Sequence, residues 1–437
     1  MRLTVIGAGY VGLSTALAAA HVGHEVVCVE REPRRLAKLL RGEDPLGEPG
    51  MEALLRLGSI RFVARDDELD RAELILVAVG TPMAADGHAE LTQIDDACRA
   101  IAYGARPGTV VAIRSTVPVG TCDRLQTGIL RHQLVVSNPE FLREGHAMED
   151  AFVPSRIVAG GPDRARPVIE KLYAPLRALA ASPAPLLWMS SRSAELAKYA
   201  ANGFLATKLS FVNEVANVAD VVGADARAVL QSMALDPRIG PGHLRPGLGW
   251  GGSCFPKDTR ALAALAAGEG YDFIILKAAI AQNARQLEQF AGVVERETPP
   301  GGIVGLLGLA FKAGSADTRE SPALALARLL AEGGRRVHAY DPAVRRLSDG
   351  AVAHVAADPI DACDGADAVV VATEWPEFAR LDLAALRRVT RGDVIVDGRA
   401  IIDPANAVAA GFRYRGVGIH RSVEEIAALA ERGRAAS

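Results

Sequence analysis

Short apolar runs that end in polar or glycine-rich turns recur along the first part of the chain. They lie at residues 3–6, 24–30, 74–79, 110–113 and 135–136. Runs of this length, bounded by turns, are typical of strands that are buried in a parallel sheet. The N-terminal part of the chain is therefore predicted to be a parallel α/β domain.

The same plan returns from about residue 300. Apolar runs lie at residues 303–308, 336–340, 369–373 and 393–397, with a helical stretch at residues 321–332. An internal echo of this kind indicates two domains of similar architecture. We predict an α/β protein with two doubly wound domains.

Between these domains the apolar period becomes that of a helix. From residue 193 to about residue 222, apolar positions of one long helix include Leu196, Phe204, Leu209, Val212, Val215 and Val218. A chain of 437 residues is long enough for about three domains. We predict α/β domains at residues 1–190 and 298–437, joined by a helical domain at residues 191–297.

A glycine-rich turn connects the first predicted strand to a helix. It reads Gly7-Ala8-Gly9-Tyr10-Val11-Gly12, and Glu30 ends the next strand. In this context GxGxxG predicts a Rossmann-like dinucleotide site, in which the helix N-terminus meets a pyrophosphate and the acid binds a ribose. Glu30 would repel a 2′-phosphate and favours NAD, although Arg31, Arg34 and Arg35 leave NADP open. A purely structural turn is the alternative.

Three polar loops are predicted at the carboxyl ends of strands, where ligands bind in such sheets. They are Gly80-Thr81-Pro82, residues 114–121 and residues 137–145. The last contains Asn138-Pro139-Glu140, which is also compatible with an ordinary turn or helix start. These loops are therefore candidates for ligand contacts.

The stretch at residues 249–258 carries the strongest chemical signal. Cys254 follows three glycines and precedes Pro256, a residue that is favoured at the start of a helix. A helix N-terminus and the neighbouring Lys257 both favour a thiolate, so Cys254 has the setting of a nucleophile. A glycine-rich turn with a small buried cysteine is the alternative.

Two further pairs of polar residues are candidates. Lys198 and Asn202 lie four apart and share a face of the central helix. Lys312 and Arg319 follow the strand at 303–308, in a turn that lacks the final glycine of the fingerprint, so a different phosphate-bearing ligand is expected there. Solvent-exposed side chains are the alternative for both pairs.

Composition narrows the classes of partner. The net charge of −3 gives no sign of a nucleic-acid or membrane-surface partner, and no apolar stretch reaches the roughly 18 residues that span a bilayer. The five cysteines show neither CxxC pairing nor neighbouring histidine clusters. We therefore expect no metal site, no disulfide framework and a cytoplasmic protein.

In combination, these motifs resemble the UDP-glucose/GDP-mannose dehydrogenases. The matching segments are residues 7–12, 115–121, 138–145 and 251–258, Lys198 with Asn202, Phe311-Lys312 and Arg319-Glu320-Ser321-Pro322. The resemblance covers essentially the whole chain. It implies an enzyme that oxidises the C6 alcohol of a nucleotide sugar to a carboxylate with two NAD⁺ in succession. It also implies a homodimer, or an assembly of dimers, built through the central helix.

The resemblance also implies roles for individual residues. The implied catalytic residues are Cys254, Lys198, Asn202, Asp258, Glu140 and Thr116. The implied NAD contacts are Gly7, Gly9, Tyr10, Val11, Gly12, Glu30, Arg35, Thr81, Pro82, Ser115, Thr116, Glu144 and Arg319. The implied substrate contacts are Glu140, Phe141, Leu142, Arg143, Lys198, Asn202, His243, Leu244, Gly251, Lys257, Phe311 and Lys312.

Within the family, Phe255-Pro256-Lys257-Asp258 resembles the UDP-glucose branch. The GDP-mannose branch, which often has Leu at the position of Phe255, is the nearest alternative. The chain departs from the family pattern at Glu30, at His243-Leu244-Arg245 and at Ser315-Ala316-Asp317, and the second departure leaves the sugar or base open.

Two other classes of function stay open. A two-electron dehydrogenase of the hydroxyacid type would need no cysteine, and a protein that only binds a nucleotide sugar would not need Cys254, Lys198 or Glu140. The number of NADH molecules formed per sugar, two, one or none, distinguishes the three.

Overall fold

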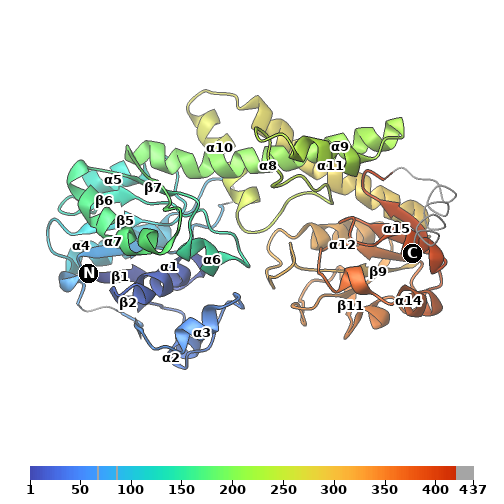
Figure 1. The fold of residues 1–437 in the computed structure, drawn as a ribbon, viewed down its shortest axis with the longest axis horizontal. Helices are drawn as coiled ribbons and strands as arrows, with labels where there is room; N and C mark the ends of the chain where they lie inside the picture. Colours follow the sequence, from blue (N-terminus) through green and yellow to red (C-terminus); the bar gives the residue numbers. More distant parts are fainter. Residues whose placement is uncertain (66–67, 85–86, 420–437) are drawn as a thin grey trace. The chain divides into compact units, whose positions relative to one another are not determined.

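The computed structural model describes residues 1–65, 68–84 and 87–419, and the chain divides into two compact units (Figure 1). The first unit comprises Met1–Asn202 and Arg260–Asp272, and the second comprises Gly203–Thr259 and the chain from Phe273. The predicted domain limits at residues 190 and 297 stay a prediction.

The first unit contains an eight-stranded sheet in the order β3-β2-β1-β4-β5-β6-β7-β8. Its strands are β1 Arg2–Ile6, β2 Glu25–Val29, β3 Ile60–Val63, β4 Leu74–Val77, β5 Val110–Ile113, β6 Leu134–Ser137, β7 Ile157–Gly160 and β8 Leu186–Met189. Neighbouring strands are parallel except β6 and β7. The predicted parallel α/β domain is confirmed.

Helices connect the strands of this sheet. They are α1 Tyr10–His21, α2 Pro33–Leu40, α3 Met51–Leu55, α4 Thr92–Gly104, α5 Thr121–Thr127, α6 Ala147–Phe152 and α7 Arg166–Leu179, with short 3-10 turns at Leu69–Arg71 and Asp163–Ala165. Val110 and Ala112 of β5 belong to one hydrophobic cluster, and Val111 and Ile113 belong to another. Both faces of the sheet are therefore buried, which explains the continuous apolar runs.

The second unit contains a six-stranded parallel sheet in the order β11-β10-β9-β12-β13-β14. Its strands are β9 Ile303–Leu307, β10 Arg336–Tyr340, β11 Val352–Val355, β12 Ala368–Val371, β13 Val394–Asp397 and β14 Arg413–Gly416. Its connecting helices are α12 Pro322–Glu332, α13 Pro359–Ala362, α14 Leu383–Val389 and α15 Pro404–Ala409, with a 3-10 turn at Phe378–Arg380. The strand order matches that of the first six strands, so the predicted repeat is confirmed.

The longest helix is α8 Ser191–Val222, which is drawn in green in Figure 1. It begins slightly earlier than predicted and contributes to both units. The other helices of this region are α9 Ala226–Ala234, α10 Phe255–Gly268 and α11 Ile274–Glu297. In the ranges that the structure describes, no helix combines the length and the apolar character needed to cross a bilayer.

Candidate active site

The turn between β1 and α1 packs so tightly that it requires glycine at two positions. Gly7 has φ +100°, and a Cβ there would lie 2.6 Å from the carbonyl oxygen of Ala78. A Cβ on Gly12 would lie 1.8 Å from the carbonyl oxygen of Gly7, whereas a Cβ on Gly9 would meet no described atom within 4 Å. Gly9 therefore faces open space at the start of α1, where a phosphate can approach the backbone N–H groups.

Glu30 lies just beyond β2 and closes the other side of this turn. Its Oε2 accepts hydrogen bonds from the Ala8 N–H at 3.2 Å and from Arg35 Nη1 at 3.0 Å. Its Oε1 accepts from the Glu32 N–H at 2.7 Å. A carboxylate beside a glycine turn that faces open space fits the ribose and pyrophosphate of a dinucleotide. Arg35 is held by Glu30, while Tyr10 donates its hydroxyl to the carbonyl of Leu46 at 3.1 Å.

The loops after β4 and β5 are linked to each other. Thr81 Oγ1 donates to the carbonyl of Thr116 at 2.9 Å, and Ser115 Oγ donates to the carbonyl of Val79 at 2.7 Å. The carbonyl of Pro82 accepts from the N–H of Glu90 at 2.8 Å. The predicted contacts in these loops therefore belong to one connected structure at the carboxyl edge of the sheet.

Glu140 and Lys198 form a buried ion pair. Lys198 Nζ lies 3.0 Å from Glu140 Oε1, and the two side chains are only 5% and 8% exposed. Asn202 is also buried, so the alternative of a solvent-exposed face is wrong for Lys198 and Asn202. Burial raises the pKa of Glu140, but Lys198, the Leu142 N–H and Arg114 together hold that pKa below its ordinary value. Glu140 is therefore ionised at neutral pH.

Arg114 fixes the turn that carries Glu140. It is buried and donates to the carbonyls of Asn138 and Pro139, at 3.2 and 3.4 Å, and to the hydroxyl of Tyr173 at 3.0 Å. Asn138 is completely buried and donates Nδ2 to the carbonyl of Val158 at 2.7 Å. The Asn-Pro-Glu turn is thus held from several sides, unlike an ordinary surface turn, and no helix starts there.

The segment after Glu140 is held by carboxylates. Arg143 pairs with Asp150 at 2.6 Å. Arg143 would have to leave this local ion pair, or share it, to contact a substrate as predicted. The Gly145 N–H, beyond half-buried Glu144, donates to buried Glu48 at 2.9 Å.

Phe141 lies between two cations, with Lys198 Nζ 5.5 Å and Arg156 Cζ 3.7 Å from its ring centre. On the same helix as Lys198, buried Glu195 accepts from the N–H groups of Gly120 and Cys122 at 2.6 and 2.8 Å. Glu195 thereby anchors the end of the loop that contains Thr116.

Cys254 lies in the second unit, immediately before α10. Its side chain is exposed, whereas Cys28, Cys98, Cys122 and Cys363 are buried. The alternative of a small buried cysteine is therefore wrong for Cys254. Burial raises the pKa of Cys98 to about 12 and also raises the pKa values of the other three buried thiols well above the ordinary range, which makes those thiols unreactive.

The first turn of α10 also contains Lys257 and Asp258. The helix begins at Phe255, so Pro256 occupies its second position and not the predicted first one. The Asp258 N–H donates to the Cys254 carbonyl at 2.8 Å. Lys257 Nζ lies 2.5 Å from the buried Asp258 carboxylate. Lys257 is therefore engaged with Asp258, and the two charges are placed next to the cysteine in the chain.

The glycines before Cys254 contact the loop that follows β9. A Cβ on Gly251 would lie 2.1 Å from the carbonyl oxygen of Glu320, and a Cβ on Gly252 would lie 2.7 Å from the Phe311 ring. Lys312 Nζ lies 5.5 Å from the centre of the Phe311 ring. Gly251 and Gly252 therefore lie against the loop that carries Phe311 and Lys312, and the role of these residues as substrate contacts stays a prediction.

Other predicted contacts of the second unit have local roles. The His243 ring lies 6.3 Å from the Phe255 ring, and Leu244 is buried. Arg319 has a largely exposed side chain that pairs with Asp317 at 2.5 Å. Its solvent exposure agrees with the alternative interpretation for that residue.

The turn after β9 differs from the turn between β1 and α1 in the environment of the acidic residue that lies beside it. Asp341 follows β10 as Glu30 follows β2, but it is almost completely buried. Its carboxylate accepts from the N–H groups of Leu309, Ala310, Ala343 and Val344 and from Trp375 Nε1, at 2.8 to 3.1 Å. Because these protein donors occupy its oxygens, Asp341 is unsuited to bind a ribose, in agreement with a turn that lacks the dinucleotide fingerprint.

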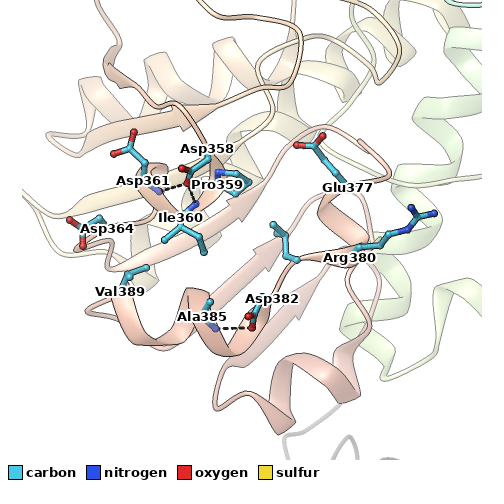
Figure 2. Close-up of a pocket in the computed structure, with 11 residues that line it drawn as sticks. Asp358, Pro359, Ile360, Asp361, Asp364, Glu377, Arg380, Asp382, Ala385 and Val389 are labelled. Carbon is cyan, nitrogen blue, oxygen red and sulfur yellow. Dashed lines mark hydrogen bonds between the residues drawn. The ribbon is translucent and has the colours of Figure 1, made fainter.

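A cavity of about 740 Å³ opens elsewhere in the second unit, between α13 and α14 (Figure 2). Its acids include Asp358 and Asp382, which cap these helices by accepting from the N–H groups of Ile360, Asp361 and Ala385 at 2.9 Å. The carboxylates thus stabilise helix ends, and the cavity contains none of the predicted site residues.

The fold and the glycine turn define a dinucleotide-dependent dehydrogenase. Three family models match in succession: the NAD-binding domain of the UDP-glucose/GDP-mannose dehydrogenase family at residues 1–177, its central domain at 192–285 and its UDP-binding domain at 305–404. The chain belongs to this family, and its cofactor is NAD.

Individual relatives are similar over nearly the full length. A UDP-glucose 6-dehydrogenase from Pseudomonas aeruginosa is 42% identical, with 97% of this chain and 98% of the relative covered. One from Bacillus subtilis is 39% identical, with 96% and 98% covered. The solved structure of a UDP-glucose dehydrogenase from Pyrobaculum islandicum is 37% identical, with a TM-score of 0.87 and 95% and 97% covered.

Several residues that shape the site were not among the sequence candidates. Glu195 and Arg156 lie outside the motifs and match no simple pattern of their own. Arg114 lies in the candidate loop at residues 114–121, but its role in holding the turn of Glu140 was not predicted. A charged residue on an otherwise apolar face of a helix is a sequence signal that could have identified Glu195. This residue is buried and lies one turn before Lys198 on α8. Arg114 directly follows a completely buried strand, which also marks it as a residue at the ligand edge.

Proposed function

We propose that this protein oxidises UDP-glucose to UDP-glucuronate, with two NAD⁺ consumed per sugar. The main supporting observation is Cys254, the one exposed thiol among the five cysteines, at the start of α10 with Asp258 in the first turn. The names of the similar relatives and the run Phe255-Pro256-Lys257-Asp258 favour UDP-glucose as the sugar nucleotide. The predicted NAD and substrate contacts listed above are part of this proposal.

The first oxidation converts the C6 alcohol to an aldehyde, with loss of a hydride from C6 and of the hydroxyl proton to water. NAD⁺, when bound, accepts the two electrons and one hydrogen of each oxidation. Lys198 and Asn202 are proposed to donate hydrogen bonds to the C6 oxygen as negative charge develops on it, with Asp258 in support. Hydrogen bonds from such donors become stronger in the transition state, and each lowers the activation free energy by about 3 kcal/mol. The buried pair with Glu140 keeps Lys198 fixed and desolvated.

The second oxidation is proposed to proceed on the cysteine. The Cys254 thiolate adds to the aldehyde carbon, and the new C–S bond gives a thiohemiacetal whose oxygen takes up a proton. Loss of a hydride from the thiohemiacetal carbon, which the second NAD⁺ would accept, and loss of the hydroxyl proton to water then leave a thioester. The sugar stays attached to the protein between the two oxidations, so the aldehyde does not escape.

Hydrolysis of the thioester completes the reaction. Water adds to the acyl carbon, the C–S bond breaks, and the acid and the Cys254 thiol are released. We propose that Glu140 accepts the proton of this water and that Thr116 positions it. The ionised state of Glu140 agrees with a base, and Glu195 anchors the Thr116 loop.

We also propose a homodimer, or an assembly of dimers, joined through α8. Phe204, Phe211, Val218 and Val222 are each more than half exposed. Their spacing of seven, seven and four residues places them on one stripe of a helix. A stripe of large apolar side chains is unfavourable in water and typical of a contact with another protein surface.

The test measures NADH formed per sugar with a panel of nucleotide sugars. Two NADH per UDP-glucose, and slower turnover of GDP-mannose under matched conditions, are the expected results. Faster turnover of GDP-mannose would move the proposal to that substrate. One NADH per sugar would identify a two-electron dehydrogenase, and none would leave only binding.

Two variants test the covalent steps. We expect Cys254→Ser to lose steady-state formation of the acid, because a serine alkoxide forms far less readily at neutral pH. We expect Glu140→Gln to accumulate an enzyme-bound thioester, detected by intact-protein mass spectrometry. Acid formation by Cys254→Ser at the wild-type rate, with no adduct on Glu140→Gln, would exclude this mechanism.

A further inference from the structure

The backbone just before Cys254 forms neither a helix nor a strand. Its polar groups are instead bound by side-chain amides. The Gly247 N–H donates to Asn213 Oδ1 at 2.8 Å, and the Gly247 carbonyl accepts from Gln286 Nε2 at 2.9 Å. The Trp250 N–H donates to Asn283 Oδ1 at 2.7 Å, and the Trp250 carbonyl accepts from Asn283 Nδ2 at 2.9 Å. Residues 247–252, here termed the cysteine-approach loop, are thus tied to α8 and α11.

Asn283 differs from the other two amides because its one side-chain amide binds both the N–H and the carbonyl of Trp250. Only a side-chain amide carries a donor and an acceptor in the required arrangement; an aspartate has no donor, and an alanine has neither group. Gly249 permits the approach: its φ is +118°, and a Cβ there would lie 2.7 Å from Asn283 Oδ1. The loop sequence and Asn283 are therefore matched to each other.

The opposite side of the loop is also fixed. The Gly252 N–H donates to the Glu320 carbonyl at 3.2 Å, and Glu320 itself has φ +48°. Trp250 is buried and donates Nε1 to Ser210 Oγ at 2.9 Å. Cys254 is thus an exposed side chain that follows a backbone segment fixed on two sides.

We infer that Asn283 is a positioning residue that holds the cysteine-approach loop, and through it Cys254, in the place required for attack on the aldehyde. This inference rests on the proposed function. A nucleophile reacts efficiently only when it is held about 3 to 3.5 Å from the carbon that it attacks, and a misplacement of about 1 Å can cost on the order of a hundredfold in rate.

The first test separates the two oxidations in Asn283→Ala. The oxidation of the alcohol needs no thiol, whereas the second oxidation does. In a single turnover with UDP-glucose and excess NAD⁺, we expect the first NADH at the wild-type rate and the second at least about tenfold more slowly. The control is Gln289→Ala, because Gln289 is an exposed amide on the same helix that contacts Asn217 at 3.1 Å. It should form both NADH molecules at wild-type rates.

Asn283→Asp provides a second variant that keeps the shape and the acceptor but removes the donor to the Trp250 carbonyl. It should also slow only the second oxidation, and it tests the inference if Asn283→Ala does not fold. Equal slowing of both oxidations in a folded variant would show a general structural role and would overturn the inference. Wild-type rates for both oxidations would overturn it as well.

A measurement without substrate distinguishes this inference from the proposed function. The rate at which iodoacetamide alkylates Cys254 is followed against pH, with Cys254→Ser as the background. We expect the midpoint of this profile to rise in Asn283→Ala and to stay unchanged in Gln289→Ala, because a displaced thiol loses the N-terminus of α10. An unchanged profile would contradict the inference even if the wild type oxidises UDP-glucose, and a shifted profile would support it even if the wild type does not.

Discussion

At the scale of single residues, Glu140 and Lys198 form an ion pair that is buried in the first unit. A buried ion pair is retained only when its charges are well matched, because desolvation of each ion is costly. The pair therefore couples two proposed roles, since each residue fixes the charge and position of the other.

We expect Lys198→Ala to lower kcat by about a hundredfold or more while KM for UDP-glucose changes much less. The reason is that a donor to the C6 oxygen is needed most in the transition state. Lys208→Ala is the matched control, because Lys208 lies farther along α8 and donates to the Ile239 carbonyl at 2.8 Å. Steady-state kinetics would refute the proposed role of Lys198 if kcat were unchanged.

The pH dependence provides a second prediction at this scale. Glu140 must be ionised to act as a base. Its pKa is held below the ordinary value of a glutamate by Lys198, the Leu142 N–H and Arg114, so activity should fall only at a pH more acidic than the ordinary titration range of a carboxyl group. Arg114 is one of the charges that lower this pKa. Arg114→Gln should therefore raise the pKa and move the acid limb of the kcat profile to higher pH. An acid limb at the same pH in both proteins would contradict this prediction.

At the scale of elements, two glycines of the turn between β1 and α1 are expected to have different roles. Gly12 is needed for packing, and Gly9 is proposed to let a ligand approach the backbone. Gly12 lies inside α1, where alanine would normally stabilise a helix by about 1 kcal/mol. The contact of 1.8 Å with the Gly7 carbonyl oxygen is so short that the clash outweighs this gain. Gly9, in contrast, has open space around it.

We expect Gly12→Ala to destabilise the protein by about 1 to 3 kcal/mol, measured by chemical denaturation. Gly9→Ala should keep wild-type stability but weaken NAD binding by about tenfold or more, because its methyl group projects toward the pyrophosphate position. Calorimetry of NAD binding checks the second effect. Wild-type affinity in Gly9→Ala would show that the pyrophosphate lies elsewhere.

The sequence was sufficient to predict the central elements because their signals are local. Strands such as β5 and β12 are buried along their whole length and stand out as apolar runs. The strands β3, β7, β8, β11 and β14 were missed. The edge strands β3 and β11 are partly exposed and lack that pattern, whereas β7 is buried and its short apolar run was not identified. The predicted strand at residues 74–79 ends earlier, at Val77, where the backbone turns into the ligand edge.

At the candidate site, too, only residues with a local sequence signal were predicted. Motifs identified Glu140, Lys198 and Cys254, whose neighbours in sequence are distinctive. Asn283 was missed because its partner, Trp250, lies 33 residues away in the sequence and the contact involves backbone groups. Such long-range pairing has no periodic signal, so only the fold could reveal it.

At the scale of the whole molecule, the exposed stripe on α8 makes a prediction about assembly. Phe211→Glu places a charge at the middle of the stripe and should convert the proposed dimer to monomers, because burial of an unpaired charge is unfavourable. Light scattering with size-exclusion chromatography measures the mass in solution. The control is Tyr103→Glu, at a more exposed aromatic position on α4, and a dimer that survives Phe211→Glu would exclude this stripe as the contact.

The buried carboxylate of Asp341 has a consequence for redesign. The first six strands of one sheet and the six strands of the other share one order, which suggests that a second nucleotide-binding turn could be engineered by restoring the two missing glycines after β9. That change would be insufficient, because Asp341 is one methylene shorter than Glu30 and already accepts hydrogen bonds from five N–H groups. Freeing its oxygens would leave those buried donors unmatched, at about 1 to 3 kcal/mol each. The two halves are therefore not interchangeable templates, despite their common topology.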